Sequence, residues 1–521
     1  MSKKKLAKNI GSMSVAVFIS RIFGLVRDIF MTGFFGTSYV ADAFQVSFQI
    51  PNLLRKLFGE GALSAAFVPI YNEVGLQKGR KAQIKFALNM LSILSLLLML
   101  LSLLGIIFAP IIVKILAPGF DEKTYLLAIK LTGIMFPYLF FIGLSSTLIS
   151  ILNSHDKFFI PGLSSAFLNI SMIAFLGFFV LLKQAASIEE EITVWSVGVV
   201  FGGLMQTAVN LPLLKKIGYS FKPSFNFGNE NLKIVWKKFL PGVVGLAIRQ
   251  INLAADLIIA SFLVSGSIAA LSYGNRLMQL PLGIFGVSAG VAVLPLFSKL
   301  TAEEKWNELS EHLKFSIIFL GFLLLPFTAL MIGLGKDIIR ILFMRGKFDL
   351  ISLNMSYQAL LFYSLGLVFY ALNRVLIPIF YAKKDTVTPV KISAFIVVLN
   401  IILNIVLMQI MQLAGLALAT SISAMVQFFV LKKFLKKKIP HFSFPKVGSD
   451  IFKISLLSLL LFLGIFSINR FFVSANFLAS VVKVITVFAG STIFYVIGSQ
   501  ILKIEYSALI KQKLWQKFHK K

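Results

Sequence analysis

The chain has 521 residues and no cysteine, which excludes disulfides, cysteine-ligated metals and thiol catalysis. It is 58% hydrophobic and only 14% charged, whereas roughly 25% of the residues of soluble domains are charged. A soluble protein this apolar could not cover its own surface, so the composition indicates an integral membrane protein. The net charge of +30 comes from basic residues in short loops, where they set topology and meet anionic headgroups. No basic stretch interleaved with aromatics indicates nucleic-acid binding.

A membrane-spanning helix needs about 20 mostly apolar residues, and about fourteen stretches meet that requirement. The sequence therefore predicts an all-α polytopic membrane protein. In chain order the predicted spans are 10–35, 43–72, 86–117, 124–152, 160–183, 192–214, 236–264, 267–297, 313–334, 353–381, 390–409, 413–434, 450–472 and 477–501.

The loops between these spans differ in charge. Alternate loops are basic, as in KKFLKKK (432–438), and the others carry few Lys or Arg residues, so the positive-inside rule places both termini in the cytoplasm. The N-terminal MSKKKLAKN is predicted to be a cytoplasmic tail and not a signal peptide, because charged residues interrupt the apolar run that follows. The outer segment 335–350 is the exception, and its mixture of basic and apolar residues suggests an amphipathic surface helix.

An internal repeat organises the chain. APIIVKILAPGFD (109–121) resembles GKDIIRILFMRGKFD (335–349), and DKFFIPGLSSAF (156–167) resembles DTVTPVKISAF (385–395). A shift of 228 residues aligns both pairs and also carries Arg21 onto Arg249 and Asp28 onto Asp256. About six helices separate the copies, an even number, so the repeats are parallel. The predicted parts are an N-lobe of six helices (1–216), a C-lobe of six helices after a cytoplasmic linker (217–437), and a C-terminal helix pair with a basic tail (438–521).

Parallel lobes of this kind are typical of transporters, which bind substrate between the lobes and rock one against the other. The predicted first two helices are unusual because they carry many charges, and a charge near the bilayer centre costs roughly 3 kcal/mol on insertion scales. These helices are therefore where function is expected. Their charged residues are Arg21, Arg27, Asp28, Asp42, Arg55, Lys56 and Glu60.

Arginines that converge on a cavity would bind a phosphate or pyrophosphate, since the planar guanidinium matches two of its oxygens. Arg27, Arg55 and Arg276 are the candidates for this role. The alternative is that they snorkel to headgroups or pair with Asp28, Asp42 and Glu60. Asp42 begins the second helix, where it either caps that helix or forms a gating ion pair.

Asp256, beside Asn252 and with Asn373, could bind a coupling Na⁺ or proton; the alternative is a structural pair between Arg249 and Asp256. No other cofactor and no metal site is expected, because the four histidines have no ligand partner at metal-binding spacing. No G-x-x-x-x-G-K-[ST] phosphate loop occurs, so direct ATP drive is not expected. The sequence thus predicts a transporter and not an enzyme.

Several segments spread over the chain are distinctive: SRIFGLVRD (20–28), ADAFQVSFQIPNLLRKLFGEGALSAAFVPIY (41–71), APGF (117–120), ILNSHDKFFIPGLSSAFLNISMI (151–173), LPLLKKIG (211–218), ASFLVSGSIAALSYGNRLMQLPLGIFGVS (260–288), VLPLFSK (293–299), GKF (346–348) and KKDTVTPVKI (383–392). In these segments the sequence resembles the MurJ (MviN) family of lipid II flippases, within the superfamily of multidrug/oligosaccharidyl-lipid/polysaccharide exporters.

The resemblance implies fourteen helices and a final pair that forms a lipid-side groove. It implies translocation of an undecaprenyl-pyrophosphate disaccharide-pentapeptide from the inner to the outer leaflet of the bacterial cytoplasmic membrane. It places the cavity arginines at Arg21, Arg27, Arg55 and Arg276 and the acidic residues at Asp42 and Glu60. Asn275 and Gln279 stand where some members carry acidic residues, which makes this cavity more positive.

On this reading the chain works by alternating access, driven by membrane potential or a coupled cation. The expected partners are lipid II, membrane lipids and cell-wall synthesis proteins. Three alternatives stay open at this point: a flippase for another prenyl-pyrophosphate-linked glycan, a cation-coupled drug exporter of the same superfamily, and a membrane enzyme acting on lipid-linked sugars.

Overall fold

The computed structural model describes residues 3–58, 62–183, 187–220, 222–439, 441–472 and 476–504, and within these ranges the chain is helical with no strand. For 3–10, 54, 56–58, 62 and 242–249 it describes the backbone alone, so the side chain of Arg249 is not described, and Glu60 lies outside the described residues. The chain forms two compact units. Unit 1 comprises Met1–Ala269 and Arg345–Lys347, and unit 2 comprises Ala270–Met344 and Phe348–Lys521.

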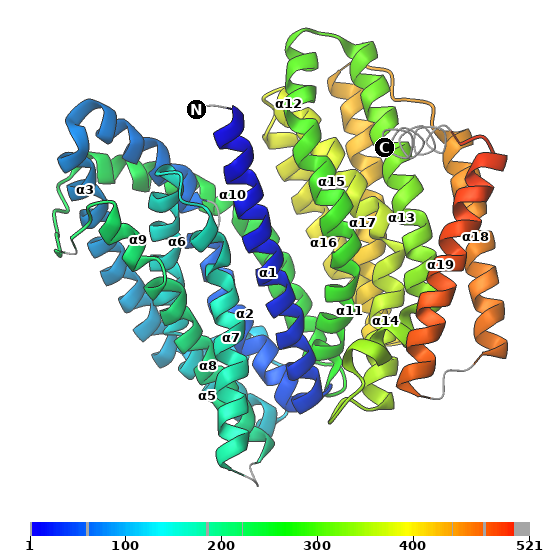
Figure 1. The fold of residues 1–521 in the computed structure, drawn as a ribbon, viewed down its shortest axis with the longest axis horizontal. Coiled ribbons are helices and arrows are strands. Elements are labelled where there is room, and N and C mark those ends of the chain that lie inside the picture. The colour runs from blue at the N-terminus through cyan, green and yellow to red at the C-terminus, as the bar shows by residue number, and fades with distance from the viewer. Residues whose placement is uncertain are drawn as a thin grey trace. The chain divides into compact units, whose positions relative to one another are not determined.

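Unit 1 is a bundle in which α7 packs along α8 and α1, α3 packs on α6, and α2 packs on α5 (Figure 1). The α7–α8 contact is close because Gly198 and Gly202 lie one helical turn apart on α8; a Cβ on Gly202 would stand 2.8 Å from the Leu168 Cα. Small residues at this spacing let membrane helices approach closely. The helices are α1 (Lys3–Phe35), α2 (Tyr39–Phe58), α3 (Ala62–Ile107, kinked at Gly79), α4 (Ala109–Leu116), α5 (Glu122–Met135), α6 (Tyr138–Ser154), α7 (Phe159–Leu182), α8 (Ile188–Ala208), α9 (Leu211–Lys216) and α10 (Glu230–Ala260).

Unit 2 is a second bundle, in which α16 packs on α17, α12 on α15, and α13 on α14, α18 and α19. Its first helix, α11, begins in unit 1 and continues into a π-helical segment, η1. The elements are α11 (Ser267–Pro281), η1 (Leu282–Val287), α12 (Ser288–Ala302), α13 (Trp306–Phe343), α14 (Leu350–Leu365), α15 (Leu367–Ala382), α16 (Val387–Met411), α17 (Leu413–Lys438), α18 (Gly448–Phe471) and α19 (Phe477–Ile501).

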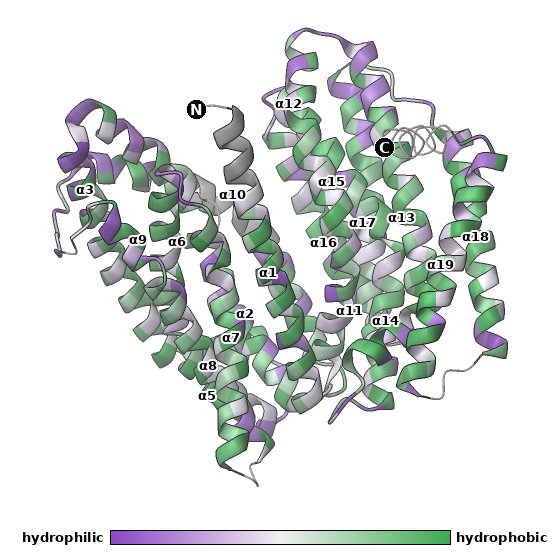
Figure 2. Cartoon of the chain, in the orientation of Figure 1, coloured by the Kyte–Doolittle hydropathy of each residue, from purple (hydrophilic) through white to green (hydrophobic). Residues whose placement is uncertain are grey.

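Ten of the described helical segments are long and apolar enough to cross a membrane, or eleven if α14 and α15, bent by 43°, form one span. Hydrophobic residues run along the sides of the helices, while hydrophilic residues gather at helix ends and loops (Figure 2). The other three predicted spans fall on α1, α2 and α10, which carry charged residues. The all-α polytopic class is confirmed, and the count of fourteen spans stays a prediction.

The helices repeat at the register that the sequence predicts. Asp121 caps α5 by accepting a hydrogen bond from the Thr124 N–H, and 228 positions further on Asp349 caps α14 by accepting one from the Ser352 N–H. At the same shift α6 ends at Ser154 and α15 at Ala382, and α7 and α16 begin at matching positions. The duplication therefore extends to helix boundaries and caps. The lobe boundary at 216/217 stays a prediction.

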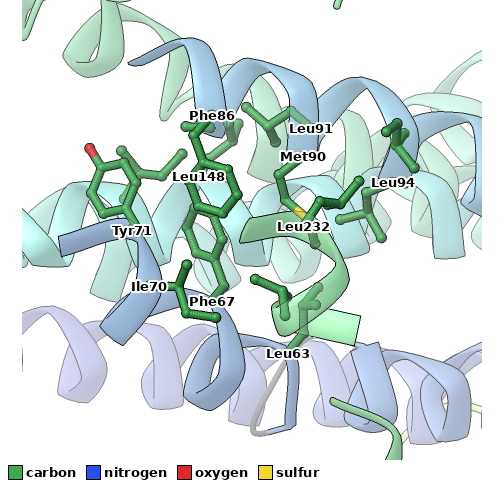
Figure 3. Close-up of a cluster of buried hydrophobic side chains, with 14 of the residues drawn as sticks. Leu63, Phe67, Ile70, Tyr71, Phe86, Met90, Leu91, Leu94, Leu148 and Leu232 are labelled. Carbon is green, nitrogen blue, oxygen red and sulfur yellow. The ribbon is translucent and has the colours of Figure 1, made fainter. Parts of the chain in front are cut away.

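A buried apolar cluster ties α10 to α3 within unit 1. Leu63, Phe67 and Met90 of α3 lie close to Leu148 of α6 and Leu232 of α10 (Figure 3). All five side chains are at most 3% exposed. This apolar contact fixes the start of α10 against the first lobe.

A partly buried polar cluster lies at the end of α6. The Tyr71 hydroxyl is 2.8 Å from His155 Nε2 and 2.5 Å from the Tyr219 hydroxyl, and Arg80 donates to His155 Nε2 at 2.7 Å. Burial, together with the Arg80 guanidinium, holds the pKa of His155 below its usual value. Arg80 also donates to the Ile217 carbonyl at 2.6 Å, so the cluster fastens the segment after α9 to α3 and α6.

The segment 335–350 differs from its prediction as a separate surface helix. Residues 335–343 continue α13 to Phe343, and a turn follows before Asp349 caps α14. Within this last part of α13 the Asp337 carboxylate is buried against Lys483 of α19. Of the basic residues that suggested a surface helix, Arg340 lies with its Nη1 3.9 Å from Asp337 Oδ1 inside unit 2.

The ion pair between Asp337 and Lys483 fastens the C-terminal helix pair to α13. Lys483 Nζ lies 3.0 Å from Asp337 Oδ2, with the two side chains 10% and 8% exposed. Lys483 Nζ also donates to the Phe472 carbonyl at 2.9 Å.

Replacing Lys483 with Met should lower the free energy of unfolding by about 3 kcal/mol, because the Asp337 carboxylate would stay buried without its main partner. Denaturation in mixed micelles measures this. The double variant Lys483→Met, Asp337→Leu should regain most of the loss. Lys299→Met, at an exposed pair, is the matched control and should change little. An equal free energy of unfolding for Lys483→Met and the parent chain would show that the ion pair does not stabilise the fold.

Candidate functional site

Arg55 is held on α2 by a ladder of amide side chains. Arg55 Nε donates to Asn52 Oδ1 at 2.9 Å, and Asn52 Nδ2 lies 3.5 Å from Gln49 Oε1. Residues three apart share one face of a helix, which explains the ladder. The ladder limits the positions open to the Arg55 guanidinium.

Arg55 lines a cavity of about 560 Å³ whose lining belongs entirely to unit 1. The walls come from α2, α3, α6, α7 and α8 and are rich in hydroxyl and amide groups, an unusual lining within an apolar bundle. The lining includes Ser64, Asn72, Ser146, Ser150, Asn153, Ser154, Ser164, Ser165 and Gln206.

The α1 arginines lie in different surroundings. Arg27 donates through Nε and Nη2 to Asp28 Oδ1, at 3.2 and 2.7 Å, and Asp28 is 6% exposed. The two residues are adjacent, so the long Arg27 side chain curls around the helix to reach its neighbour. Arg21 is exposed. The preceding residue, Ser20, shares a 2.6 Å hydrogen bond with Ser165, a cavity residue of α7.

Asp42 belongs to α2 but caps the start of another helix, α11. Its carboxylate accepts hydrogen bonds from the Gly266 N–H at 2.6 Å and the Ala269 N–H at 2.8 Å, at the start of α11. Gly266 has φ +89°, and a Cβ there would stand 2.3 Å from the Thr37 carbonyl oxygen. Asp42 is 4% exposed, so it serves two backbone donors in a dry site. This arrangement is neither of the two predicted from the sequence.

The acidic run Glu189–Glu191 at the start of α8 forms ion pairs that sequence reasoning missed. Glu189 pairs with Lys123 at 3.1 Å and accepts from the Tyr39 hydroxyl, and Glu191 pairs with Lys347 at 3.2 Å. The Lys347 N–H also donates to the Gly33 carbonyl at 2.7 Å. The segment Arg345–Lys347 is therefore anchored in unit 1 at both backbone and side chain.

The other predicted residues are distributed over both units. Asn252 donates to Asp256 Oδ2 at 3.3 Å in unit 1. In unit 2, Asn373 donates to the Ala424 carbonyl and to Gln427 Oε1, at 2.9 and 3.1 Å.

Arg276 is exposed on α11 in unit 2, beside a hydrogen bond from Gln279 to Asn275. Its convergence with Arg27 and Arg55 of unit 1 stays a prediction. Within the described part of the chain no group of three or more His, Asp or Glu side chains could hold a metal ion.

The sequence model described as "Lipid II flippase MurJ" matches residues 31–495. Among curated proteins, "Probable lipid II flippase MurJ" of Buchnera aphidicola subsp. Schizaphis graminum is 36% identical over 98% of this chain and 99% of its own length. "Lipid II flippase MurJ" of Burkholderia cenocepacia is 33% identical over 82% of this chain and 83% of its own length.

Among solved structures, "Lipid II flippase MurJ, inward closed conformation" aligns with a TM-score of 0.76 and 31% identity, over 94% of this chain and 99% of that chain. An inward-facing multidrug resistance MATE family transporter aligns with a TM-score of 0.67 but only 14% identity, so it shows a shared fold alone. The extent of the sequence match and the closeness of the fold lead to one conclusion: the chain belongs to the MurJ family of lipid II flippases.

Proposed function

We propose that this chain flips lipid II, the lipid-linked peptidoglycan precursor, from the inner to the outer leaflet of the bacterial cytoplasmic membrane by alternating access. It acts as a multi-pass transporter and not as an enzyme. The observation that carries the proposal is Arg55 on the wall of a polar cavity inside an apolar bundle. The names of its relatives supply the substrate.

The chemistry of the substrate explains the arginines. A pyrophosphate that enters hydrocarbon loses its water, at a prohibitive cost unless the protein replaces it. Arg27, Arg55 and Arg276 replace that water with bidentate charged hydrogen bonds, while Arg21 raises the positive potential at the entrance. Asp42 and Glu60 contribute to the gate and to the sugar-peptide contacts. The prenyl tail stays in lipid along α18 and α19.

The inside-negative membrane potential supplies a driving force for translocation, since it favours outward movement of an anion by about 2.3 kcal/mol per charge per 100 mV. A coupled Na⁺ or proton is a second source, for which Asn252, Asp256 and Asn373 are the candidate residues. The basic loops support cytoplasmic termini. Proteins of cell-wall synthesis are the expected partners, because they consume the flipped precursor.

Arg27→Ala, Arg55→Ala and Arg276→Ala should each fail to support growth of bacteria depleted of their own lipid II flippase, because each removes a pyrophosphate ligand. The parent chain should rescue at the same membrane level. Arg470→Ala, at an exposed arginine of α18, is the matched control and should rescue. Growth with all three cavity variants would refute the arginine assignment, and failure of the well-expressed parent chain would refute lipid II as substrate.

Asp42→Ala should loosen the start of α11, because it leaves the Gly266 and Ala269 N–H groups buried without an acceptor, at about 1–3 kcal/mol for each group. Hydrogen exchange of a peptide covering 264–270 should therefore speed up by about tenfold or more, and growth rescue should fall. Asp121→Ala uncaps α5 and is the matched control. Unchanged exchange at 264–270 in Asp42→Ala would mean that the carboxylate does not hold this turn.

A further inference from the structure

The linker between α9 and α10 is held against α3 through its backbone. Asn89 of α3 accepts a hydrogen bond from the Asn226 N–H at 2.7 Å through Oδ1 and donates to the Asn226 carbonyl at 2.9 Å through Nδ2. Ser92, about one turn further along α3, accepts from the Ser224 N–H at 3.0 Å. Asn89 is 1% exposed, so residues 224–226 lie directly on α3.

These hydrogen bonds fix the depth of the linker in the membrane. Lys85 is followed by the uncharged apolar run 86–107, which ends a membrane-spanning segment. At 1.5 Å per residue the run is about 33 Å long, and the hydrocarbon core of a bilayer is about 30 Å thick. Asn89 and Ser92 therefore lie about 6 and 10 Å beyond Lys85. This places the linker backbone at the boundary between headgroups and acyl chains.

Two aromatic side chains of the linker are exposed at this depth. Phe225 and Phe227 are 55% and 59% exposed. On α3, Leu96 and Met99 are exposed as well, and they follow Ser92 within the apolar run, where lipid covers them. The bilayer that covers this stripe of α3 also reaches the two phenylalanines.

The linker 439–447, between α17 and α18, shows a different arrangement of the same residue spacing. Its aromatic residues are Phe442, which is buried, and Phe444, whose ring centroid lies 6.5 Å from that of Phe428. Lys432 Nζ lies 4.5 Å from the centre of the Phe444 ring. The protein itself covers the aromatic pair of this linker, whereas the pair beside α3 is left for lipid.

Exposed lysines lie on both sides of Phe225 and Phe227 in the sequence. The first turns of α10 bury Leu232 and Val235 in unit 1, and their opposite face is exposed and basic. Basic residues near a membrane are attracted to the anionic headgroups of the cytoplasmic leaflet. A combination of basic and exposed aromatic residues is typical of segments that lie in the membrane interface. The exposed lysines are Lys222, Lys233, Lys237 and Lys238.

We propose that residues 222–238 form an interfacial anchor that binds the anionic lipid surface of the cytoplasmic leaflet. Phe225 and Phe227 insert among the upper parts of the acyl chains, and the four lysines contact the headgroups. Asn89 and Ser92 set the depth of the anchor by holding its backbone on α3. The inference goes beyond the proposed function and does not depend on which lipid is transported.

A fluorescent reporter in nanodiscs tests the insertion. The chain has no cysteine, so Gly228→Cys introduces a single thiol for an NBD label; a Cβ there would stand 3.4 Å from Asn226 Oδ1, an ordinary contact. A lipid with a nitroxide near the top of its acyl chain should quench this reporter by about half, and iodide in the water should quench it little. The same label on Gln77→Cys, at an exposed position of α3, should show the reverse.

Phe225→Ser with Phe227→Ser should remove about two thirds of the lipid quenching at Cys-labelled position 228. Both side chains are exposed, so the fold should persist. Leu76→Ser, at an exposed apolar residue of α3 outside the linker, is the matched control and should leave the quenching unchanged. A parent reporter that iodide quenches and the lipid nitroxide does not, or lipid quenching that persists without the two phenylalanines, would overturn the anchor.

The lipid composition tests the charge. Nanodiscs with about a third of phosphatidylglycerol should give more lipid quenching of the reporter than nanodiscs of phosphatidylcholine alone. Replacing the four lysines together, as Lys222→Gln, Lys233→Gln, Lys237→Gln and Lys238→Gln, should abolish this difference. Equal quenching of the parent reporter in both lipid mixtures would overturn the anionic surface as the partner. None of these results bears on lipid II as the transported substrate.

Discussion

Charged and polar groups inside a bundle of apolar helices must find partners, because neither lipid nor a packed core replaces the water that they lose. The structure meets this constraint differently at each site. Asp337 and Lys483 pair with each other, and Arg27 pairs with Asp28. Arg55 lies on a cavity wall, where Asn52 Oδ1 accepts a hydrogen bond from its Nε. This hydrogen bond helps to hold the side chain on the face of α2 that lines the cavity.

Backbone groups at helix ends follow the same constraint. Asp121 and Asp349 cap their own helices at equivalent places in the repeat, as expected for a duplicated structural element. Asp42 does something different, because its carboxylate is shared by two N–H groups at the start of α11. A cap that joins two distant segments can be made and broken as a unit. The Asp42 carboxylate therefore fastens the start of α11 to α2.

Much of the fold follows from local pattern. The apolar stretches of about 20 residues predict where the spans lie. The aligned motifs around Asp121 and Asp349 predict the repeat, because helix formation and capping depend on neighbouring residues. The partners of Asp42 and Glu191 could not be predicted, since they lie 224 and 156 residues away. Residues 335–343 resemble a surface segment in sequence, because the pairing of Asp337 with Lys483 of α19 is visible only in the structure. The serines of the cavity look like ordinary packing residues, and only their common wall reveals a site.

The central claim is that one folded chain moves lipid II across a membrane through a site containing Arg55. The most direct measurement is transfer of fluorescent lipid II between the leaflets of proteoliposomes that contain the purified protein and hold a potential. The account predicts faster transfer than in protein-free vesicles, and a return to that background with Arg55→Gln of equal incorporation. Transfer by the folded parent protein no faster than in protein-free vesicles would contradict it.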